Sequence, residues 1–330
     1  MARDLPHRAE HVGSLLRPRE LKEAFRRYQV AELGAEAFAA IQDRCIRNAI
    51  RMQHDVGLET ITDGEFRRAA WSAAFVWALD GLSERDSRFE FHDDAGETQR
   101  WRTCFATGRI RRARPITLAE FGFVRRHTDR TPKVTMPAPS FLHFFRAGDF
   151  AAEGVYADRK AFWSDVVRAY REELEELARA GAPYVQIDEV PLAMLCDETI
   201  RERIRSLGED PDSLVEEYVA AVNHAIDPRP QGLTVGMHLC RGNLRGKWMA
   251  AGGYEPIAER VFGGIAVDAF FLEYDSPRAG DFAPLRFVPR ETRVVLGLVS
   301  TKTPLLEDAD TLRRRIDEAA RVVPLERLAL

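Results

Sequence analysis

Three residues near the ends of two predicted strands carry the side chains of a metal site. His238 and Cys240 lie two positions apart in the run LTVGMHLC, residues 233–240. In a β-strand this spacing points both side chains to the same face, where one ion could take both. Glu273 lies near the end of the next predicted strand, VDAFFLEYD, residues 267–275. Nitrogen, sulfur and carboxylate donors together suit a borderline-soft ion such as zinc.

A His-x-Cys pair alone is weak evidence, because histidine and cysteine are also common core residues. The carboxylate on the adjacent strand strengthens the metal interpretation. In parallel β/α barrels the active site is built at the carboxyl ends of the strands, so polar residues at these ends are the next candidates. They are Ser14, Asp63, Glu65, Asp188, Glu189, Asp275 and the group Ser300–Lys302.

The elements that would position these residues follow a repeating pattern. Short β-rich runs alternate with long amphipathic segments, which is typical of a parallel α/β fold. We expect strands at residues 9–16, 58–65, 133–140, 184–190, 233–240, 267–275 and 294–301. We expect helices at residues 19–33, 35–56, 158–181, 212–226 and 308–323. The alternation predicts a (β/α)8 TIM barrel with the helices outside.

Two segments depart from the repeat. The final residues, LERLAL, have the character of an eighth strand that has only begun, so we expect this strand to be truncated. Residues 83–130 read as an inserted β-hairpin with polar tips. A chain of 330 residues is within the range of one barrel. We therefore predict a single domain over residues 1–330, with an insertion at about 83–130.

Composition excludes several classes of partner. Acidic residues outnumber basic ones, 52 to 48, which gives no electrostatic reason to expect nucleic acid or an anionic membrane. The sequence contains no apolar stretch long enough to span a membrane. The four cysteines are scattered without a CxxC pair, which favours a reducing cytoplasm over a disulfide framework. We expect a small-molecule substrate, and a homo-oligomer is left open.

Six sequence segments, taken together, indicate a protein family. HVGSLLRP, TDGEFRRAAW, VQIDEV, MHLCRGN, FLEYD and LGLVSTKTP occur in this order between residues 11 and 304. Together they resemble the catalytic barrel of the cobalamin-independent methionine synthase superfamily, in a single-barrel short form. The resemblance implies a zinc-dependent methyltransferase that makes methionine from homocysteine, with zinc held by His238, Cys240 and Glu273. The family's second cysteine ligand would fall just past Leu330.

The resemblance also implies a site for homocysteine. Ser14 and its neighbouring backbone would meet the carboxylate, and Glu65 and Asp188 would hold the ammonium group. Two carboxylates at strand ends can bind a cation through charge-assisted hydrogen bonds. Each residue also has a structural alternative, which is a turn cap for Ser14 and ion pairs with nearby basic residues for the two acids.

This sequence departs from the family in ways that bear on the donor and the acid. The large amino-terminal barrel that helps to bind polyglutamylated folate is missing, so the methyl donor is open between a simpler folate and a corrinoid. The family's general acid, a histidine before Ser-Pro, is replaced by Lys302 before Thr-Pro. Lys302 could act as acid or anion contact, and His11 could carry protons, although a salt bridge and a packed imidazole are the alternatives. Trp71 and Trp248 could wall a flat donor or pack in the core.

Two other functions compete with methionine synthesis. Epoxyalkane:coenzyme M transferases are similar single-barrel zinc enzymes that alkylate a sulfonate thiol. Such a thiol has no ammonium group, so a basic residue such as Arg17 or Lys302 should face its tail. The third hypothesis is a non-catalytic barrel whose zinc is structural or absent, and a closed shell of four protein ligands would support it.

Overall fold

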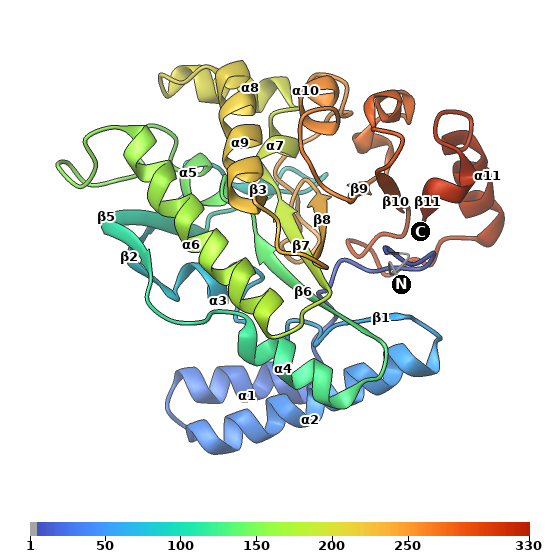
Figure 1. Ribbon diagram of the computed structural model, residues 1–330, viewed down its shortest axis with the longest axis horizontal. Coiled ribbons are helices and arrows are strands. Elements are labelled where there is room, and N and C mark those ends of the chain that lie inside the picture. Colours follow the sequence, from blue (N-terminus) through green and yellow to red (C-terminus); the bar gives the residue numbers. More distant parts are fainter. Residues whose placement is uncertain (1–4) are drawn as a thin grey trace.

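The computed structural model describes residues 5–330, which form a curled seven-stranded parallel sheet with helices around it (Figure 1). The strand order is β1-β6-β7-β8-β9-β10-β11, and each neighbouring pair is parallel. The strands are β1 (Thr60–Ile61), β6 (Thr131–Pro137), β7 (Tyr184–Glu189), β8 (Thr234–Leu239), β9 (Ala269–Glu273), β10 (Arg293–Gly297) and β11 (Leu328–Ala329). Six of the seven predicted strands are therefore confirmed, although β1 is shorter than expected.

The predicted strand at residues 9–16 is wrong, because this segment has no regular structure. Gly13 adopts φ +104°, and its amide donates to Nδ1 of His11 at 3.1 Å, so the chain turns here. The segment nevertheless lies along the edge of the sheet. The amide of Glu10 donates to the carbonyl of Leu330 at 2.8 Å, and the amide of Leu15 donates to the carbonyl of Gly64 at 3.1 Å. An irregular segment thus bridges β11 and the residues after β1, and residues 8–10 lie beside Leu330 (Figure 1).

The helices cover the outside of the sheet. They are α1 (Arg19–Gln29), α2 (Ala35–Asp55), α3 (Ala73–Val76), α4 (Leu118–His127), α5 (Phe141–Phe144), α6 (Arg159–Arg179), α7 (Pro191–Met194), α8 (Glu198–Ser206), α9 (Pro211–Ile226), α10 (Ala258–Phe262) and α11 (Ala309–Ala319). The five predicted helices are confirmed as α1, α2, α6, α9 and α11. Short 3-10 turns lie at Pro277–Ala279, Ala283–Phe287 and Leu325–Arg327. Within residues 5–330, none of the helices combines the length and the apolar character that crossing a membrane requires.

Helix α6 shows why these segments fold as they do. Asp158 caps its start by accepting a hydrogen bond from the amide of Ala161 at 2.7 Å. Phe162, Val166 and Tyr170 recur at helical spacing and are fully buried against the sheet and α9. The helix ends before Gly181, whose φ of +84° suits a glycine after a helix.

Strand β7 shows how the sheet sorts its side chains. Val185 and Ile187 point outward into the main hydrophobic core beneath the helices. Tyr184 alternates with them and joins a separate apolar cluster, with Phe271 as one of its members, that fills the inside of the curl. By the same alternation Asp188 faces inward above that cluster, at the carboxyl end of the strand.

Residues between β1 and β6 form smaller sheets on one flank. β2 (Leu79–Asp86) pairs antiparallel with β5 (Arg102–Arg112), and β3 (Phe91–His92) pairs antiparallel with β4 (Thr98–Gln99). β5 packs against α6. The following helix, α4, packs against β6 and α2, so it belongs with the helices that cover the sheet.

Candidate functional site

The predicted metal ligands lie on one wall of the inner face, where β8 and β9 end. The ladder pairs His238 with Phe271 and Leu239 with Leu272. Continued by one residue, this register sets Cys240 opposite Glu273. Residues at alternate positions of paired parallel strands share a face, so all three donors project to the side on which Phe271 fills the inner cluster.

His238 and Cys240 are in a state that a soft metal ion could use. Burial, helped by the charge of Lys133, lowers the pKa of His238 to about 3, so its imidazole is neutral. Its Nδ1 is buried and has no hydrogen-bond partner among residues 5–330. Burial, with the neighbouring Glu273 carboxylate, raises the pKa of the Cys240 thiol to about 12. The thiol therefore ionises only when a strong positive charge is bound beside it.

Glu273 is already engaged by two donors. Its Oε2 accepts a hydrogen bond from the amide of Arg241 at 2.7 Å, and its Oε1 lies 3.1 Å from Nζ of Lys302. The same ammonium lies 2.9 Å from Oδ2 of Asp275. Burial lowers the pKa of Lys302, but the two carboxylates raise it by more, so the net shift is upward. Lys302 is thus a fixed cation at the ends of β9 and β10.

The donors fit zinc in type but are not assembled around a common point. Within residues 5–330, no three side chains of histidine, cysteine, aspartate or glutamate stand close enough to hold a metal ion. The structure therefore does not show the convergence that the sequence predicts. Oε1 of Glu273 instead lies 3.1 Å from the ammonium of Lys302.

Two inward acids, Glu65 and Asp188, form a second group next to this wall. The β7–β8 register pairs Asp188 with His238, so Asp188 lies next to one of the predicted metal ligands. Burial raises the pKa of Asp188 well above its ordinary value, and the charge of Glu65 adds to the shift. Burial also raises the pKa of Glu65, against the opposing charge of Arg68. Two buried acids that destabilise each other's charge are a natural site for a cation.

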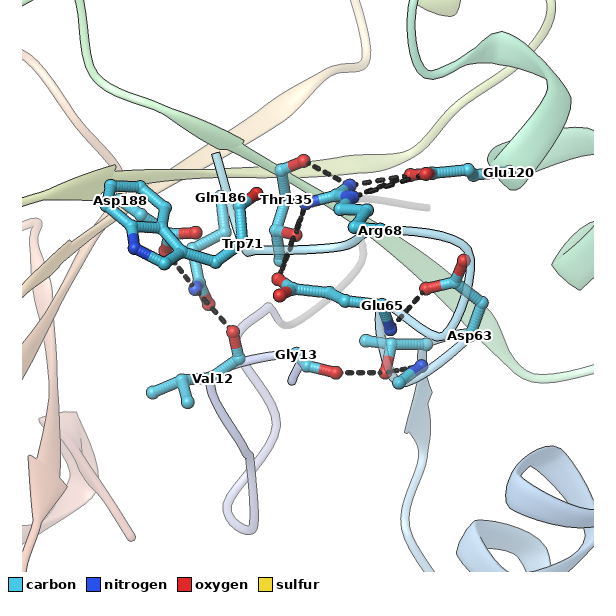
Figure 2. A network of polar contacts seen from close by, with 12 residues as sticks. Val12, Gly13, Asp63, Glu65, Arg68, Trp71, Glu120, Thr135, Gln186 and Asp188 are labelled. Carbon is cyan, nitrogen blue, oxygen red and sulfur yellow. Dashed lines mark hydrogen bonds and ion pairs between the residues drawn. The ribbon is translucent and has the colours of Figure 1, made fainter. Parts of the chain in front are cut away.

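The partners of these acids leave one oxygen unused. Oε1 of Glu65 accepts from the Thr135 hydroxyl at 2.6 Å and lies 3.4 Å from Arg68, whereas its Oε2 is buried without a partner among residues 5–330. Gln186 donates to Oδ1 of Asp188 at 2.7 Å and to the carbonyl of Val12 at 2.9 Å. Figure 2 shows these contacts, in which Gln186 joins Val12, in the turn after residue 11, to Asp188.

The backbone at Glu65 is held in an uncommon conformation. Its φ is +60°, in the left-handed region that side chains rarely adopt, and such strain often marks functional sites. Oδ1 of Asp63 accepts the amide of Glu65 at 2.8 Å and fixes the turn. Arg68 then anchors the following residues through Glu120 at 2.6 Å and the carbonyl of Thr135 at 2.8 Å (Figure 2).

Ser14 and His11, predicted for substrate binding and proton transfer, lie in the irregular segment at residues 9–16. Ser14 is exposed, one residue after the turn at Gly13. Nε2 of His11 lies 2.8 Å from Oε1 of Gln53, and its Nδ1 accepts the amide of Gly13. Burial, with the charge of Lys133, lowers the pKa of His11 to about 4. Both ring nitrogens thus shape the turn, and a proton-carrying role for His11 stays a prediction.

The two tryptophans have packing roles in this structure. Trp71 contacts Phe141 edge to face, with 5.1 Å between ring centroids. Trp248 is 8% exposed and forms backbone bonds with His92 of β3, and the guanidinium of Arg278 lies 3.9 Å from its ring. Trp248 therefore joins the β3–β4 pair to the loop after β8.

The sequence already suggested Arg68 as an ion-pair partner of Glu65, and the two lie 3.4 Å apart, but other contacts that complete the site were missed. Gln186 sits two positions before Asp188 on the same face, and strand alternation could have identified it. Arg68 and Glu120 pair across 52 positions, and no local pattern indicates that pairing. Tyr254 and Arg241 lie in the connection between β8 and β9, where the sequence shows no periodicity.

Comparison with known proteins decides the family. The sequence profile described as "Cobalamin-independent synthase, Catalytic domain" matches residues 9–330. The chain belongs to this family. Among its relatives is the uncharacterized protein YxjH of Bacillus subtilis, 37% identical over 99% of this chain and 86% of that protein. The methionine synthase of Pyrococcus abyssi is 25% identical over 93% of this chain and 80% of that protein.

The fold agrees with the family. A crystal structure of a proposed vitamin-B12 independent methionine synthase from Listeria monocytogenes superposes with a TM-score of 0.79 and 32% identity. The superposition covers 98% of this chain and 90% of that one. Membership of the cobalamin-independent synthase family identifies the chain as a methyltransferase of the methionine synthase type. It also corrects one expectation, because a family that works without cobalamin gives no support for a corrinoid donor.

Proposed function

We propose that this protein is a zinc-dependent methyltransferase that converts homocysteine to methionine. The observation that carries the proposal is the pair of buried acids, Glu65 and Asp188, beside the thiol of Cys240. An amino-acid thiol needs an ammonium site and a sulfur site at a short separation. The chain offers both at the ends of neighbouring strands.

The ammonium site follows from charge balance. Glu65 has a buried oxygen without a partner, and Asp188 has its pKa raised partly by the charge of Glu65. A substrate ammonium between the two acids would restore the ionised form of both through charge-assisted hydrogen bonds. Ser14, at the exposed rim, is our candidate for the substrate carboxylate.

His238, Cys240 and Glu273 are the residues that would hold zinc. A bound zinc ion would lower the pKa of the acceptor thiol, so that the sulfur reacts as a thiolate. The chain's own part is to orient the substrate and to balance charge. Lys302 holds Glu273 and Asp275. Its raised pKa keeps the ammonium protonated at neutral pH, and its role as a proton donor stays a prediction.

The methyl donor that fits the family resemblance is a methyltetrahydrofolate. We propose that donors with short and with long glutamate tails both serve, which the assay below compares. The epoxyalkane:coenzyme M alternative is not favoured, since it needs a free basic residue at the thiol tail. Arg17 instead donates to the carbonyl of Arg68 at 2.7 Å, and Lys302 binds two acids.

A transfer assay tests the proposal. The zinc-loaded chain is incubated with homocysteine and methyltetrahydrofolate carrying one or three glutamates, and methionine is quantified. We expect methionine with both donors, and a loss in rate of at least about 10- to 100-fold for Cys240→Ser, because even the supporting contacts of metal ligands have effects of this size. Full activity in a rigorously metal-free preparation contradicts the zinc assignment. A tightly bound zinc with four protein ligands and no transfer to any thiol would favour the non-catalytic barrel.

A further inference from the structure

One buried hydroxyl joins the two strand ends that carry the proposed zinc ligands. Tyr254 lies in the connection between β8 and β9 and is fully buried. Its hydroxyl donates to the carbonyl of Leu239 at 2.8 Å and accepts the amide of Glu273 at 3.1 Å. Leu239 is the residue before Cys240, so the hydroxyl touches the backbone beside both predicted ligands.

The hydroxyl stands where the ladder between the strands stops. The β8–β9 register ends at the pair of Leu239 and Leu272. Beyond that pair, the tyrosine hydroxyl supplies the acceptor for the Glu273 amide and the donor for the Leu239 carbonyl. The separation of the two ligand-bearing residues is therefore set by a side chain from a loop.

Arg241 locks this tyrosine in place. Its guanidinium lies 4.5 Å from the centroid of the Tyr254 ring, and its Nη1 donates to the tyrosine hydroxyl at 3.3 Å. Its Nε and Nη2 donate to the carbonyl of Gly252 at 3.0 and 2.5 Å. That carbonyl belongs to a constrained turn, since Gly252 has φ +112° and a Cβ there would lie 2.6 Å from the carbonyl oxygen of Cys196.

Arg241 also contacts Glu273 directly. Its backbone amide donates to Oε2 of Glu273 at 2.7 Å, which fixes one carboxylate oxygen and leaves the other for a cation. The guanidinium is 0% exposed, and none of the ion pairs found within residues 5–330 includes it. A buried cation held by carbonyls and a phenol is expensive for the fold. We therefore attribute this arrangement to positioning of the site rather than to the stability of the fold.

We propose that Arg241 and Tyr254 are positioning residues that link the backbone of Glu273 to the residue before Cys240, so that both side chains are presented to one metal ion when it binds. Neither residue is a ligand. This inference rests on the proposed function, because it assumes that β8 and β9 carry the metal. It adds the claim that metal affinity depends on a hydroxyl that does not touch the metal.

The decisive variant is Tyr254→Phe, which removes the hydroxyl and keeps the ring beneath Arg241. Its matched control is Tyr170→Phe. Tyr170 is equally buried, and its hydroxyl donates to the carbonyl of Pro137 at 2.7 Å, at the end of β6 and away from the ligands. Tyr170→Phe loses one buried hydrogen bond, whereas Tyr254→Phe also leaves the Glu273 amide and one nitrogen of Arg241 without that acceptor, so thermal unfolding should report a larger loss of stability for Tyr254→Phe.

The readouts are cobalt and zinc affinity by chelator competition, and the visible spectrum of the cobalt-loaded chain. We expect Tyr254→Phe to weaken affinity about 10- to 100-fold and to change the cobalt bands, because supporting contacts of metal ligands typically have effects of this size. Tyr170→Phe should bind cobalt as the parent chain does. Equal affinity and equal spectra for Tyr254→Phe and the parent chain overturn the inference.

A second variant covers the case in which Tyr254→Phe does not fold. Arg241→Lys keeps the charge and the backbone amide but lacks the fork that reaches Gly252 and Tyr254 together. It should also weaken cobalt binding, and parent-like affinity in this variant counts against the inference. A parent chain that binds neither metal overturns the proposed function and this inference with it, so the two failures are distinguishable.

Discussion

Replacement of Glu65 by glutamine is the sharpest test of the ammonium site. The carboxylate is 2% exposed, and its Oε2 is the buried oxygen without a partner in the described chain. Glutamine is nearly isosteric and can still accept from the Thr135 hydroxyl, which lies 2.6 Å from Oε1 in the parent. The variant therefore removes a charge and leaves the shape of the site intact.

The expected loss of homocysteine affinity follows from the charge-assisted hydrogen bond that the substrate ammonium no longer makes. A hydrogen bond to a charged group contributes about 1.5–3 kcal/mol, so homocysteine affinity should fall about 10- to 150-fold. Asp188 partly compensates, since Glu65 is one cause of its raised pKa and that cause disappears in the variant. An acid with a raised pKa loses its charge as pH falls through that pKa. The pH at which homocysteine binding is lost should therefore be lower in Glu65→Gln than in the parent chain.

Calorimetry with two thiols separates this effect from general damage. Homocysteine is compared with 4-mercaptobutanoate, which keeps the thiol and carboxylate but lacks the ammonium group. We expect the parent chain to prefer homocysteine and Glu65→Gln to lose most of that preference. Glu189→Gln is the matched control, because Glu189 is a buried acid at the same end of β7 that accepts from Ser140 at 2.5 Å, away from the inner face. Equal loss for both thiols, or no preference in the parent, would refute the reasoning.

Two further predictions concern charges around the site. Lys302→Met removes the ammonium that contacts the Glu273 carboxylate. The affinity for a divalent metal, measured by chelator competition, should therefore rise by about 10-fold or more. Weaker metal binding in this variant would count against Lys302 as the competing cation. Burial raises the pKa of Glu189 from 4.5 to about 7, although hydrogen bonds from Ser140 and Leu192 oppose the shift. The protonated Glu189 side chain therefore contributes fully to stability below about pH 4.5, and this contribution is lost as the pH rises through 7. Relative to Glu189→Gln, the free energy of unfolding of the parent chain should fall by about 3 kcal/mol over that range in urea titrations, and parallel pH profiles would disprove it.

Much of the fold is readable from the sequence because its strands and helices have distinct periods. Buried strands such as β7 carry apolar residues on the outer face and end in acids, and α6 shows its cap, stripe and terminal glycine. The segment at residues 9–16 misled because its alternation resembles a strand. Its turn depends on Gly13, where a Cβ would lie 2.5 Å from Thr135, and that neighbour is far away in sequence.

The candidate site was predictable where strand ends alone define it. Glu65, Asp188, His238, Cys240 and Glu273 all lie at the ends of β-rich runs. The structure pairs Asp188 with His238 on neighbouring strands, but within residues 5–330 it does not bring the three predicted metal ligands to one point. Their detailed state was not predictable. It depends on contacts between distant segments, which local patterns do not encode.

Dependence on contacts between distant segments also explains which interactions were missed. Tyr254 acts through a hydroxyl that reaches two strands from a loop, and Arg68 meets a glutamate 52 positions away. For Lys302 the sequence left an acid, an anion contact and a salt bridge open, and the structure shows the salt bridge, with Glu273 and Asp275. Each of these roles arises from burial and charge balance in the folded chain.

X-ray absorption at the zinc edge, recorded with and without homocysteine, tests the central claim most directly. The account predicts one zinc per chain with nitrogen, sulfur and oxygen neighbours, and one additional sulfur neighbour only when homocysteine is present. The sulfur signal should not increase with methionine, whose thioether has no proton to lose. A chain that takes up no zinc, or a zinc shell that homocysteine leaves unchanged, would contradict the account.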